Sequence, residues 1–532
     1  MGGTNERPAA EQVVLAVDLG TGGPKTALVS LDGTVIDAAH QRVEPRVTAA
    51  GAATQDPEQW WAAVVDGARR LTAAHPDAAR RVVAVAVTGQ WGSTVPVDRD
   101  GNAVGDCLLW MDTRGGELAK AQVGGPIEGF APRAIIEFLR RTGGAPSLEG
   151  NDPMGHRLWI QHREPDVFAR TAMFVEPLDY LNARFCGRVA ASQASMLLSW
   201  LTDNRRLGVT SYDPVLVRLS GTSHDRLPPL VRTGSTVGTV LDDVADRLGV
   251  ERGIPVLTAL PDLHSAALGS GAVGHYEGHL SISTSGWVGC HTPGKKTSIT
   301  KQMATVPSAL EGSYVLANNH ETAGMCVEWA RGLFVTADDG LTTPADGSLG
   351  ALDAVAATAP SGSGGVLFAP WLNGERSPVA DAELRGGFHG MSLSTTRADL
   401  VRSVLEGVAH NNRWLLEESE AVLKHSLGEP RVIGGGAVSD VWCQIHADVV
   451  GRPLHRVAQP LFANVRGAAF FAGLSLGLLR RGDIAGRVLV DRTFRPDPSA
   501  RRIHDAMHRE FTQLHKVERK MYHRLAELRA GA

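Results

Sequence analysis

An aspartate, a hydroxyl and a lysine surround a glycine-rich turn near the start of the chain, in the stretch Asp18-Leu-Gly-Thr-Gly-Gly-Pro-Lys25. Small residues leave backbone N–H groups open to a phosphate, and a lysine adds positive charge beside it. An aspartate at the end of the preceding apolar run could hold a hydrated Mg²⁺. An ordinary glycine-rich turn is the alternative. A P-loop is disfavoured, because Pro24 stands where that motif requires glycine before the lysine.

Two further turns of small residues lie in the second half of the chain. Ser283-Thr-Ser-Gly286 offers hydroxyls and backbone donors, and Gly434-Gly-Gly-Ala-Val-Ser439 would let a flat ring lie against the backbone. Each turn alone is more often structural than nucleotide-binding. One such loop in the first half and two in the second favour a phosphate-handling protein.

A single acid, Asp262, lies between these loops in the stretch PDLHSAALGSG. A carboxylate at a strand end could take a proton from a substrate hydroxyl. Aspartate is also a frequent N-cap residue, here for a helix starting near Leu263. The pattern alone leaves both roles open.

Short buried strands must position these loops. Val13–Val17 and Val82–Val87 are continuous apolar runs, which are typical of strands buried on both faces, and HLSISTSG and RVIGGGA continue the series. Helical patterns lie between the strands, so we predict an α/β protein. Thr21 and Thr284 follow similar strands about half a chain apart, which suggests a duplication with its boundary close to Asp262.

Composition excludes several classes of function. The 532 residues hold 53 basic and 57 acidic side chains, which gives no basic excess for nucleic acid or an anionic membrane. The five cysteines are far apart and form no metal-binding or disulfide pattern. The N-terminus lacks a signal-peptide core, and the longest apolar stretch is shorter than a membrane span. We therefore predict a cytoplasmic protein. The histidines at 504, 508 and 515 lie on the expected C-terminal helix, and we predict that they are surface residues.

Six segments in order, from about residue 13 to about residue 498, resemble the FGGY family of carbohydrate kinases. They are VDLGTGGPKTAL, TGQWGSTVPVDRDGNAVGDCLLWMDTR, PDLHSAALGSGAVG, APWLNGERSP with the RGGFHGMSL and DLVRSVLEG that follow, GGGAVSDVWCQIHADVVGRPL and Gly467-Ala-Ala469. The resemblance implies a two-lobed actin and sugar-kinase fold of the ribonuclease H-like type, with a duplicated core and an interlobe cleft. It also implies phosphorylation of a sugar, ketose or polyol hydroxyl by ATP and Mg²⁺. The expected parts are a disordered tail at 1–12, an N-terminal lobe at 13–262, a C-terminal lobe at 263–498 and a terminal helix at 499–532.

The same resemblance assigns the site residues. Asp262 is the expected general base and Asp18 the expected metal ligand. The expected acceptor contacts are Gln90, Trp91, Gly92, Trp110, Asp262 and Leu263. The expected nucleotide contacts are Gly20, Thr21, Gly22, Lys25, Thr284, Ser285, Gly324, Gly434, Gly435, Gly436, Ala437 and Ser439. A small sugar or polyol is the expected partner, and a homodimer is possible.

Three departures from the family pattern bear on this hypothesis. Ser283 stands where the second phosphate loop usually has glycine, and His156 stands where the first signature usually has lysine. Trp91 replaces the polar groups of typical xylulokinases and glycerol kinases, so the acceptor stays open: a pentulose first, a glycerol- or hexulose-type substrate second. A catalytically weak binding relative is a further alternative. A hydrolase, prompted by Gly473-Leu-Ser-Leu-Gly477, is disfavoured because that segment has helical spacing.

Overall fold

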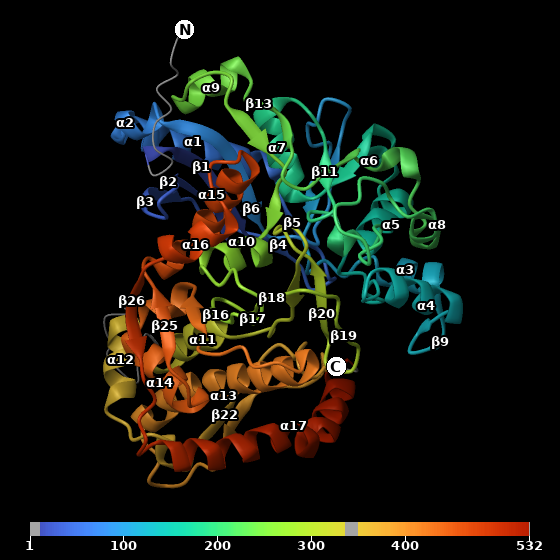
Figure 1. The fold of residues 1–532 in the computed structure, drawn as a ribbon. Helices are drawn as coiled ribbons and strands as arrows, with labels where there is room; N and C mark the ends of the chain where they lie inside the picture. The colour runs from blue at the N-terminus through green and yellow to red at the C-terminus, as the bar shows by residue number, and fades with distance from the viewer. Residues whose placement is uncertain (1–10, 336–348, 531–532) are drawn as a thin grey trace.

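The computed structural model describes residues 11–335 and 349–530. Figure 1 shows two lobes, the first half of the chain forming most of the upper one and the second half the lower one. Most of the expected tail lies outside the described residues, whereas the carbonyl of Gln12 accepts a hydrogen bond from the N–H of Leu31. Within the described ranges, no helix is long and apolar enough to cross a membrane.

The upper lobe is built on a seven-stranded mixed sheet. Its path runs β13-β14-β6-β1-β2-β3, and β15 also pairs with β6. β1 pairs antiparallel with β2 and parallel with β6, so β1 lies in the centre of the sheet. The bounds are β1 (Val13–Gly20), β2 (Gly23–Ser30), β3 (Val35–His40), β6 (Val82–Gly89), β13 (Thr236–Thr239), β14 (Pro255–Leu257) and β15 (Leu260–Pro261).

Helices cover both faces of this sheet, which explains why β1 is apolar along its length. Leu15 and Val17 face the core beneath α1 (Pro57–Ala74) and α7 (Pro177–Cys186). Val14 and Ala16 face α10 (Asp262–Gly269) and α15 (Ala463–Ser475). Alternate side chains of a strand point to opposite faces, so a doubly covered strand has no polar side.

Helix α15 comes from the far end of the sequence but packs on the first sheet (Figure 1). It crosses α10 at two glycines: an added Cβ would lie 1.8 Å from the oxygen of Ala463 at Gly269, and 1.8 Å from the oxygen of Ser265 at Gly467. Only glycine permits such close backbone contact. Gly467-Ala-Ala469 is therefore a helix-packing segment that joins the second half of the chain to the first sheet.

The lower lobe repeats the opening of the upper one. Its five-stranded sheet has the order β17-β16-β24-β25-β26, in which β16 pairs antiparallel with β17 and parallel with β24. In the upper lobe, β1 likewise pairs antiparallel with the strand that follows it, β2, and parallel with β6. The predicted duplicated α/β fold is therefore confirmed. The bounds are β16 (His279–Ile282), β17 (Gly286–Gly289), β24 (Arg431–Ile433), β25 (Leu454–Val457) and β26 (Val490–Phe494), with α11 (Gly324–Phe334), α13 (Arg397–Leu423) and α14 (Asp440–Val450) packed around it.

The remaining elements lie in connections and smaller sheets. The strands are β4 (Arg46–Val47), β5 (Ala53–Gln55), β7 (Val95–Val97), β8 (Cys107–Leu108), β9 (Gly124–Ile127), β10 (Met173–Val175), β11 (Ala191–Ser192), β12 (Leu230–Val231), β18 (His291–Thr292), β19 (Thr297–Ser298), β20 (Met303–Pro307), β21 (Tyr314–Ala317), β22 (Leu367–Ala369) and β23 (Gly387–His389). The helices are α2 (Pro76–Ala79), α3 (Gly116–Val123), α4 (Pro132–Arg141), α5 (Pro153–Arg163), α6 (Pro165–Arg170), α8 (Pro214–Ser220), α9 (Asp242–Leu248), α12 (Leu349–Ala357), α16 (Arg481–Arg487) and α17 (Arg501–Ala530), with short 3₁₀ turns η2 (Leu197–Ser199), η3 (His224–Arg226), η4 (Ser363–Gly365), η5 (Gly435–Val438) and η6 (Pro460–Phe462).

Candidate active site

The two candidate carboxylates lie at one edge of the first sheet. Asp18 in β1 is opposite Thr88 in β6, and Gly89 in β6 is opposite Pro261 in β15. These three strands are parallel, so their carboxyl ends meet at the same edge. Asp262 follows Pro261 directly and therefore starts from the edge that carries Asp18.

Asp262 is the first residue of α10, with Pro261 as its cap residue. Its Oδ1 accepts the N–H of Leu263 at 2.7 Å, and the side chain is partly exposed. Loss of water around the carboxyl, together with the negative charge of Asp18, raises the pKa of Asp262 to about 7. A carboxylate with that pKa can accept a proton near neutral pH.

Asp18 is held from both halves of the chain. Its Oδ2 lies 3.5 Å from Nζ of Lys25 in β2 and 3.5 Å from Nδ2 of Asn464 in α15. Across residues 11–335 and 349–530, no three His, Cys, Asp or Glu side chains gather closely enough to hold a metal by themselves. Mg²⁺ characteristically uses one or two carboxylates and completes its shell with phosphates and water.

The first glycine loop joins β1 to β2. Gly22 is exposed, and an added Cβ would meet no atom within 4 Å, so its backbone is open to a ligand. Thr21 faces the other way: its Oγ1 accepts the indole N–H of Trp110 at 3.1 Å and lies 3.3 Å from Oε1 of Gln90. The hydroxyl of Thr21 thus connects the loop to the expected acceptor residues.

Gln90, Trp91 and Gly92 form a turn directly after β6. Gln90 is buried, and its Nε2 has no hydrogen-bond partner among the described residues. Trp91 is partly exposed, and both it and Trp287 of β17 pack against a buried cluster that contains Leu263 of α10. This cluster brings the turn after β6, the helix that begins with Asp262, and the second lobe into contact.

Two further side chains, His264 and Glu176, contact Trp91 and the residue that follows the turn. The ring of His264 meets the ring of Trp91 edge-on, with centroids 6.3 Å apart. A buried carboxyl, Glu176, accepts the N–H of Ser93 at 3.2 Å, and burial raises its pKa well above the usual value. The sequence alone did not indicate either residue.

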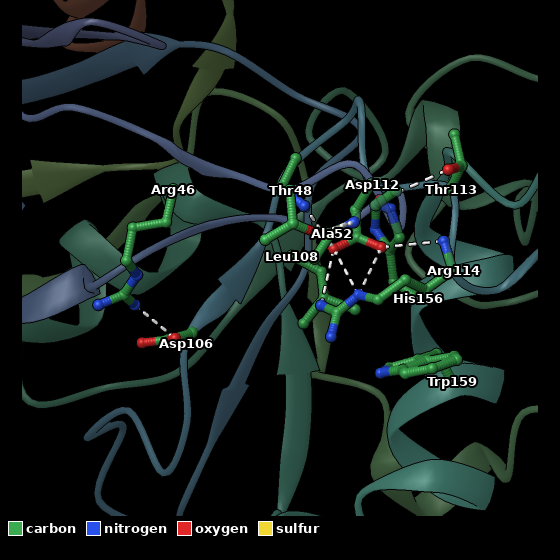
Figure 2. A network of polar contacts seen from close by, with 12 residues as sticks. Arg46, Thr48, Ala52, Asp106, Leu108, Asp112, Thr113, Arg114, His156 and Trp159 are labelled. Carbon is green, nitrogen blue, oxygen red and sulfur yellow. Dashed lines mark hydrogen bonds and ion pairs between the residues drawn. The ribbon is translucent and has the colours of Figure 1, made fainter.

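An ion-pair network is centred on Asp112, which follows Trp110 by two residues in the sequence (Figure 2). The guanidinium of Arg114 binds the buried carboxylate of Asp112, with Nη2 to Oδ2 at 2.7 Å, and lies over the ring of Trp159. His156, which stands in the place of the family's lysine, is buried nearby, and burial lowers its pKa to about 4. The substitution therefore leaves a neutral imidazole where the family usually has a cation.

The second glycine loop connects β16 to β17 and is held by the start of α11. The N–H groups of Gly324 and Ala323 donate to the carbonyls of Ser283 and Thr284 at 2.8 and 3.0 Å. An added Cβ on Gly324 would lie 2.7 Å from the oxygen of Ser283, so glycine is required for this close approach. Thr284 is exposed and Ser285 is partly exposed, which leaves both available to a ligand.

The third loop, Gly434–Ser439, lies against the second loop. A Cβ on Gly434 would lie 2.5 Å from the oxygen of Ile282 and 2.7 Å from Oγ of Ser283. A Cβ on Gly435 would meet only Cδ1 of Leu461, at 3.7 Å, so this glycine has space around it. Ala437 is buried, and Ser439 caps α14. The hydroxyl of Ser439 accepts the N–H of Trp442 at 2.9 Å.

The predicted residues thus form two neighbouring groups. Asp18, the first loop and the turn after β6 belong to the first sheet, and the second and third loops belong to the second sheet. Asn464 and Trp287 connect the groups, and neither was expected. The segment Gly473–Gly477 that resembles a hydrolase motif falls at the end of α15 and just beyond it, so it lacks the strand-turn-helix of a nucleophile elbow.

Comparison with known families agrees with this layout. The model of the N-terminal domain of the FGGY family of carbohydrate kinases matches residues 13–269. The model of the C-terminal domain of that family matches residues 279–476. Between them, the two matches include every residue assigned above to the site.

Individual relatives extend over most of the chain. The xylulose kinase of Staphylococcus epidermidis is 27% identical over 521 residues, which are 96% of this chain and 98% of that protein. The xylulose kinase of Escherichia coli is 29% identical over 448 residues, 83% of this chain and 85% of that protein. The crystal structure of xylulose kinase from Rhodospirillum rubrum, 26% identical, superimposes with a TM-score of 0.79 over 96% of this chain and all of that one.

Proposed function

This chain belongs to the FGGY family of carbohydrate kinases, and we propose that it transfers the γ-phosphoryl group of ATP to a hydroxyl of a pentulose, with Asp262 as the general base. The observation on which the proposal rests is the position of Asp262 beside Asp18 at the edge of the first sheet. One carboxylate is then available for a proton and the other for a metal, and both lie at the edge of the sheet where the first glycine loop begins.

The residues present fit ATP and Mg²⁺. Gly434 and Gly324 sit where any side chain would collide with neighbouring backbone, while Gly22 and Gly435 are open enough for a ligand to approach. Thr21 adjoins Gly22 in the first loop, Thr284 and Ser285 lie in the second loop against Gly324, and Lys25 and Asp18 supply the charges. Bound Mg²⁺ would neutralise charge that develops on the transferring phosphoryl group.

In the proposed transfer, Asp262 accepts the proton of the attacking hydroxyl as the new oxygen–phosphorus bond forms. The bond between the γ-phosphorus and the oxygen that bridges it to the β-phosphate breaks, and ADP leaves with that oxygen. A pKa of about 7 suits this role, because the carboxylate is both populated and basic near neutral pH. Leu263 fixes Oδ1 through its N–H, which leaves Oδ2 free to face the acceptor. Lobe closure would exclude water that otherwise hydrolyses ATP.

The acceptor is proposed to lie against Trp91, with Gln90 and Trp110 beside it. The partly exposed indole of Trp91 offers an apolar stacking face, and Nε2 of Gln90 is a buried donor that still lacks an acceptor. A buried donor without a partner is costly, so a ligand hydroxyl would be favoured there. The xylulose kinases among the relatives make a pentulose the first choice.

An ADP-coupled assay with purified protein and a panel of acceptors tests the proposal. The panel should contain the pentuloses xylulose and ribulose in both enantiomeric forms, glycerol, a hexulose and gluconate. We expect the highest kcat/KM with one pentulose. A higher value with glycerol or the hexulose would establish the second candidate substrate class, and nucleotide binding without turnover on any acceptor would contradict the kinase assignment.

A further inference from the structure

The segment Gly374-Glu-Arg376 belongs to the stretch that resembles the family's C-terminal signature, and it lies outside the three glycine loops in sequence. Glu375 within it is buried and accepts four hydrogen bonds. Its Oε1 accepts the N–H groups of Glu321 at 3.0 Å and Arg376 at 2.8 Å. Its Oε2 accepts Nδ2 of Asn411 at 2.7 Å and lies 3.2 Å from Nδ1 of His320. A carboxylate so fully coordinated fixes the position of every donor around it.

His320 is the link from this carboxylate to the second glycine loop. Its backbone N–H donates to the carbonyl of Gly286 at 2.7 Å. Its ring is buried, and Nε2 has no partner within the described part of the chain. Nδ1 also lies 3.0 Å from Nδ2 of Asn411, the amide that donates to Oε2 of Glu375. In the tautomer with hydrogen on Nδ1, that N–H donates to Glu375, and Nε2 carries only a lone pair.

The residues after His320 hold the rest of the loop. Ala323 and Met325 both donate their N–H groups to the carbonyl of Thr284, at 3.0 and 3.2 Å, and Gly324 donates to Ser283. Glu375 fixes the start of this segment at His320 and Glu321. The carboxylate of Glu375 and the second loop are therefore linked by hydrogen bonds to the same short segment, residues 320–325.

We propose that Glu375, acting through His320, is a positioning residue that holds the second glycine loop in its phosphate-binding conformation. The inference rests on the proposed function, because it takes this loop to bind nucleotide. It assigns a role to the glutamate of the signature, which lies outside the set of ligand-contacting residues. Glu375 needs its charge, since an amide would turn a donor toward Asn411 and His320.

The test compares Glu375→Gln with Glu406→Gln in the full-length protein. Glu406 is a matched control: it is buried, and it accepts bonds from Gly362, Ser363 and Arg402, away from the second loop. We expect Glu375→Gln to raise the dissociation constant of ADP at least tenfold and to speed hydrogen exchange at Gly324. Glu406→Gln should change that constant less than twofold. Equal effects of the two substitutions would overturn the proposal.

A second pair of variants covers the case in which Glu375→Gln does not fold. His320→Asn keeps a donor near the position of Nδ1, whereas His320→Gln places its amide near the position of Nε2. We expect His320→Asn to bind ADP within about threefold of the unmodified protein and His320→Gln to bind at least tenfold more weakly. Equal binding by the two would overturn the proposal. ADP binding requires no acceptor, so failure of the ketose assay would contradict only the proposed function.

Discussion

Asn464 lies with its side-chain nitrogen 3.5 Å from Oδ2 of Asp18, although 446 positions separate the two residues. Asn464 is in the first turn of α15, the helix that the second half of the chain packs on the first sheet. Four residues earlier, the carbonyl of Pro460 accepts the N–H of Gly434 at 2.9 Å. One short segment therefore contacts both the third glycine loop and the proposed metal ligand.

Replacing Asn464 by alanine should weaken use of the metal. Without the amide, Asp18 keeps Lys25 but loses its contact with the second lobe. Hydrogen bonds to charged groups contribute about 1.5–3 kcal/mol, and this one is long, so we expect the Mg²⁺ concentration for half-maximal rate to rise about threefold to tenfold.

A Mg²⁺ titration at saturating ATP and acceptor measures this effect. Asn102→Ala is the matched control, because Asn102 also contacts an aspartate, Asp98, at 3.3 Å, but in an exposed turn of the first lobe. An unchanged Mg²⁺ requirement in Asn464→Ala would show that the contact does not orient Asp18.

Asp262→Asn should abolish transfer while sparing nucleotide binding. The amide keeps the size of the side chain and can still accept the N–H of Leu263, but it cannot take a proton. General base catalysis contributes about 10²–10⁴-fold, so kcat should fall by that factor. Calorimetric titration with ADP should give an affinity within about twofold of the unmodified protein. Near-normal turnover would show that another group is the base.

The raised pKa of Asp262 also predicts how rate and stability depend on pH. Because the base must be ionised, kcat/KM for the acceptor should rise with pH and level off above about 7. The free energy of unfolding should instead fall as the pH rises. The folded state binds this proton more tightly than the unfolded state, so the carboxyl's contribution is fully present below pH 4 and is lost as pH rises through about 7.

Thermal unfolding of the unmodified protein and Asp262→Asn across pH 4 to 8 measures that second effect. Because the carboxyl of Asp262 loses stability when it ionises in the folded protein, the Asn variant should be the more stable at pH 8 and lose its advantage near pH 4. A constant difference across the range would mean that the carboxyl is not perturbed in the folded protein.

Local patterns were enough to predict the strands and loops, because each apolar run ends at the residues that serve the site. Asp18 near the end of β1 and Asp262 directly after β15 illustrate this. Asn464 was not predictable, since its role depends on α15 crossing between lobes at Gly269 and Gly467, and contacts at such separation leave no local pattern. His504 and His508 were predicted at the surface but are buried, because α17 packs them against His410 of α13.

Trp91→Ala should affect the acceptor and not the nucleotide. The indole packs against the buried cluster that contains Leu263, the residue after the proposed base, so its loss removes an apolar wall there. Burying a large aromatic side chain contributes about 1.5–3 kcal/mol, and we expect the acceptor KM to rise at least tenfold. The KM of ATP should stay within about twofold. An unchanged acceptor KM would remove Trp91 from the acceptor site.

Ser283→Gly should leave nucleotide binding almost unchanged, although the family usually has glycine at this position. Glycine is needed where φ is positive or another atom comes too close. Ser283 is not among the non-glycine residues of the described chain that have positive φ, and its hydroxyl lies 3.0 Å from Oγ of Ser281. We therefore expect the dissociation constant of ADP to change less than twofold.

Gly434→Ala supplies the contrasting variant from the adjoining loop. Its φ is +96°, and a Cβ there would lie 2.5 Å from the oxygen of Ile282, so the loop must shift and ADP binding should weaken at least tenfold. Calorimetric titration of both variants with ADP gives the comparison. A tenfold stronger binding of ADP by Ser283→Gly would contradict this expectation. It would show that the serine impairs the nucleotide site, and it would support the alternative of a catalytically weak binding relative.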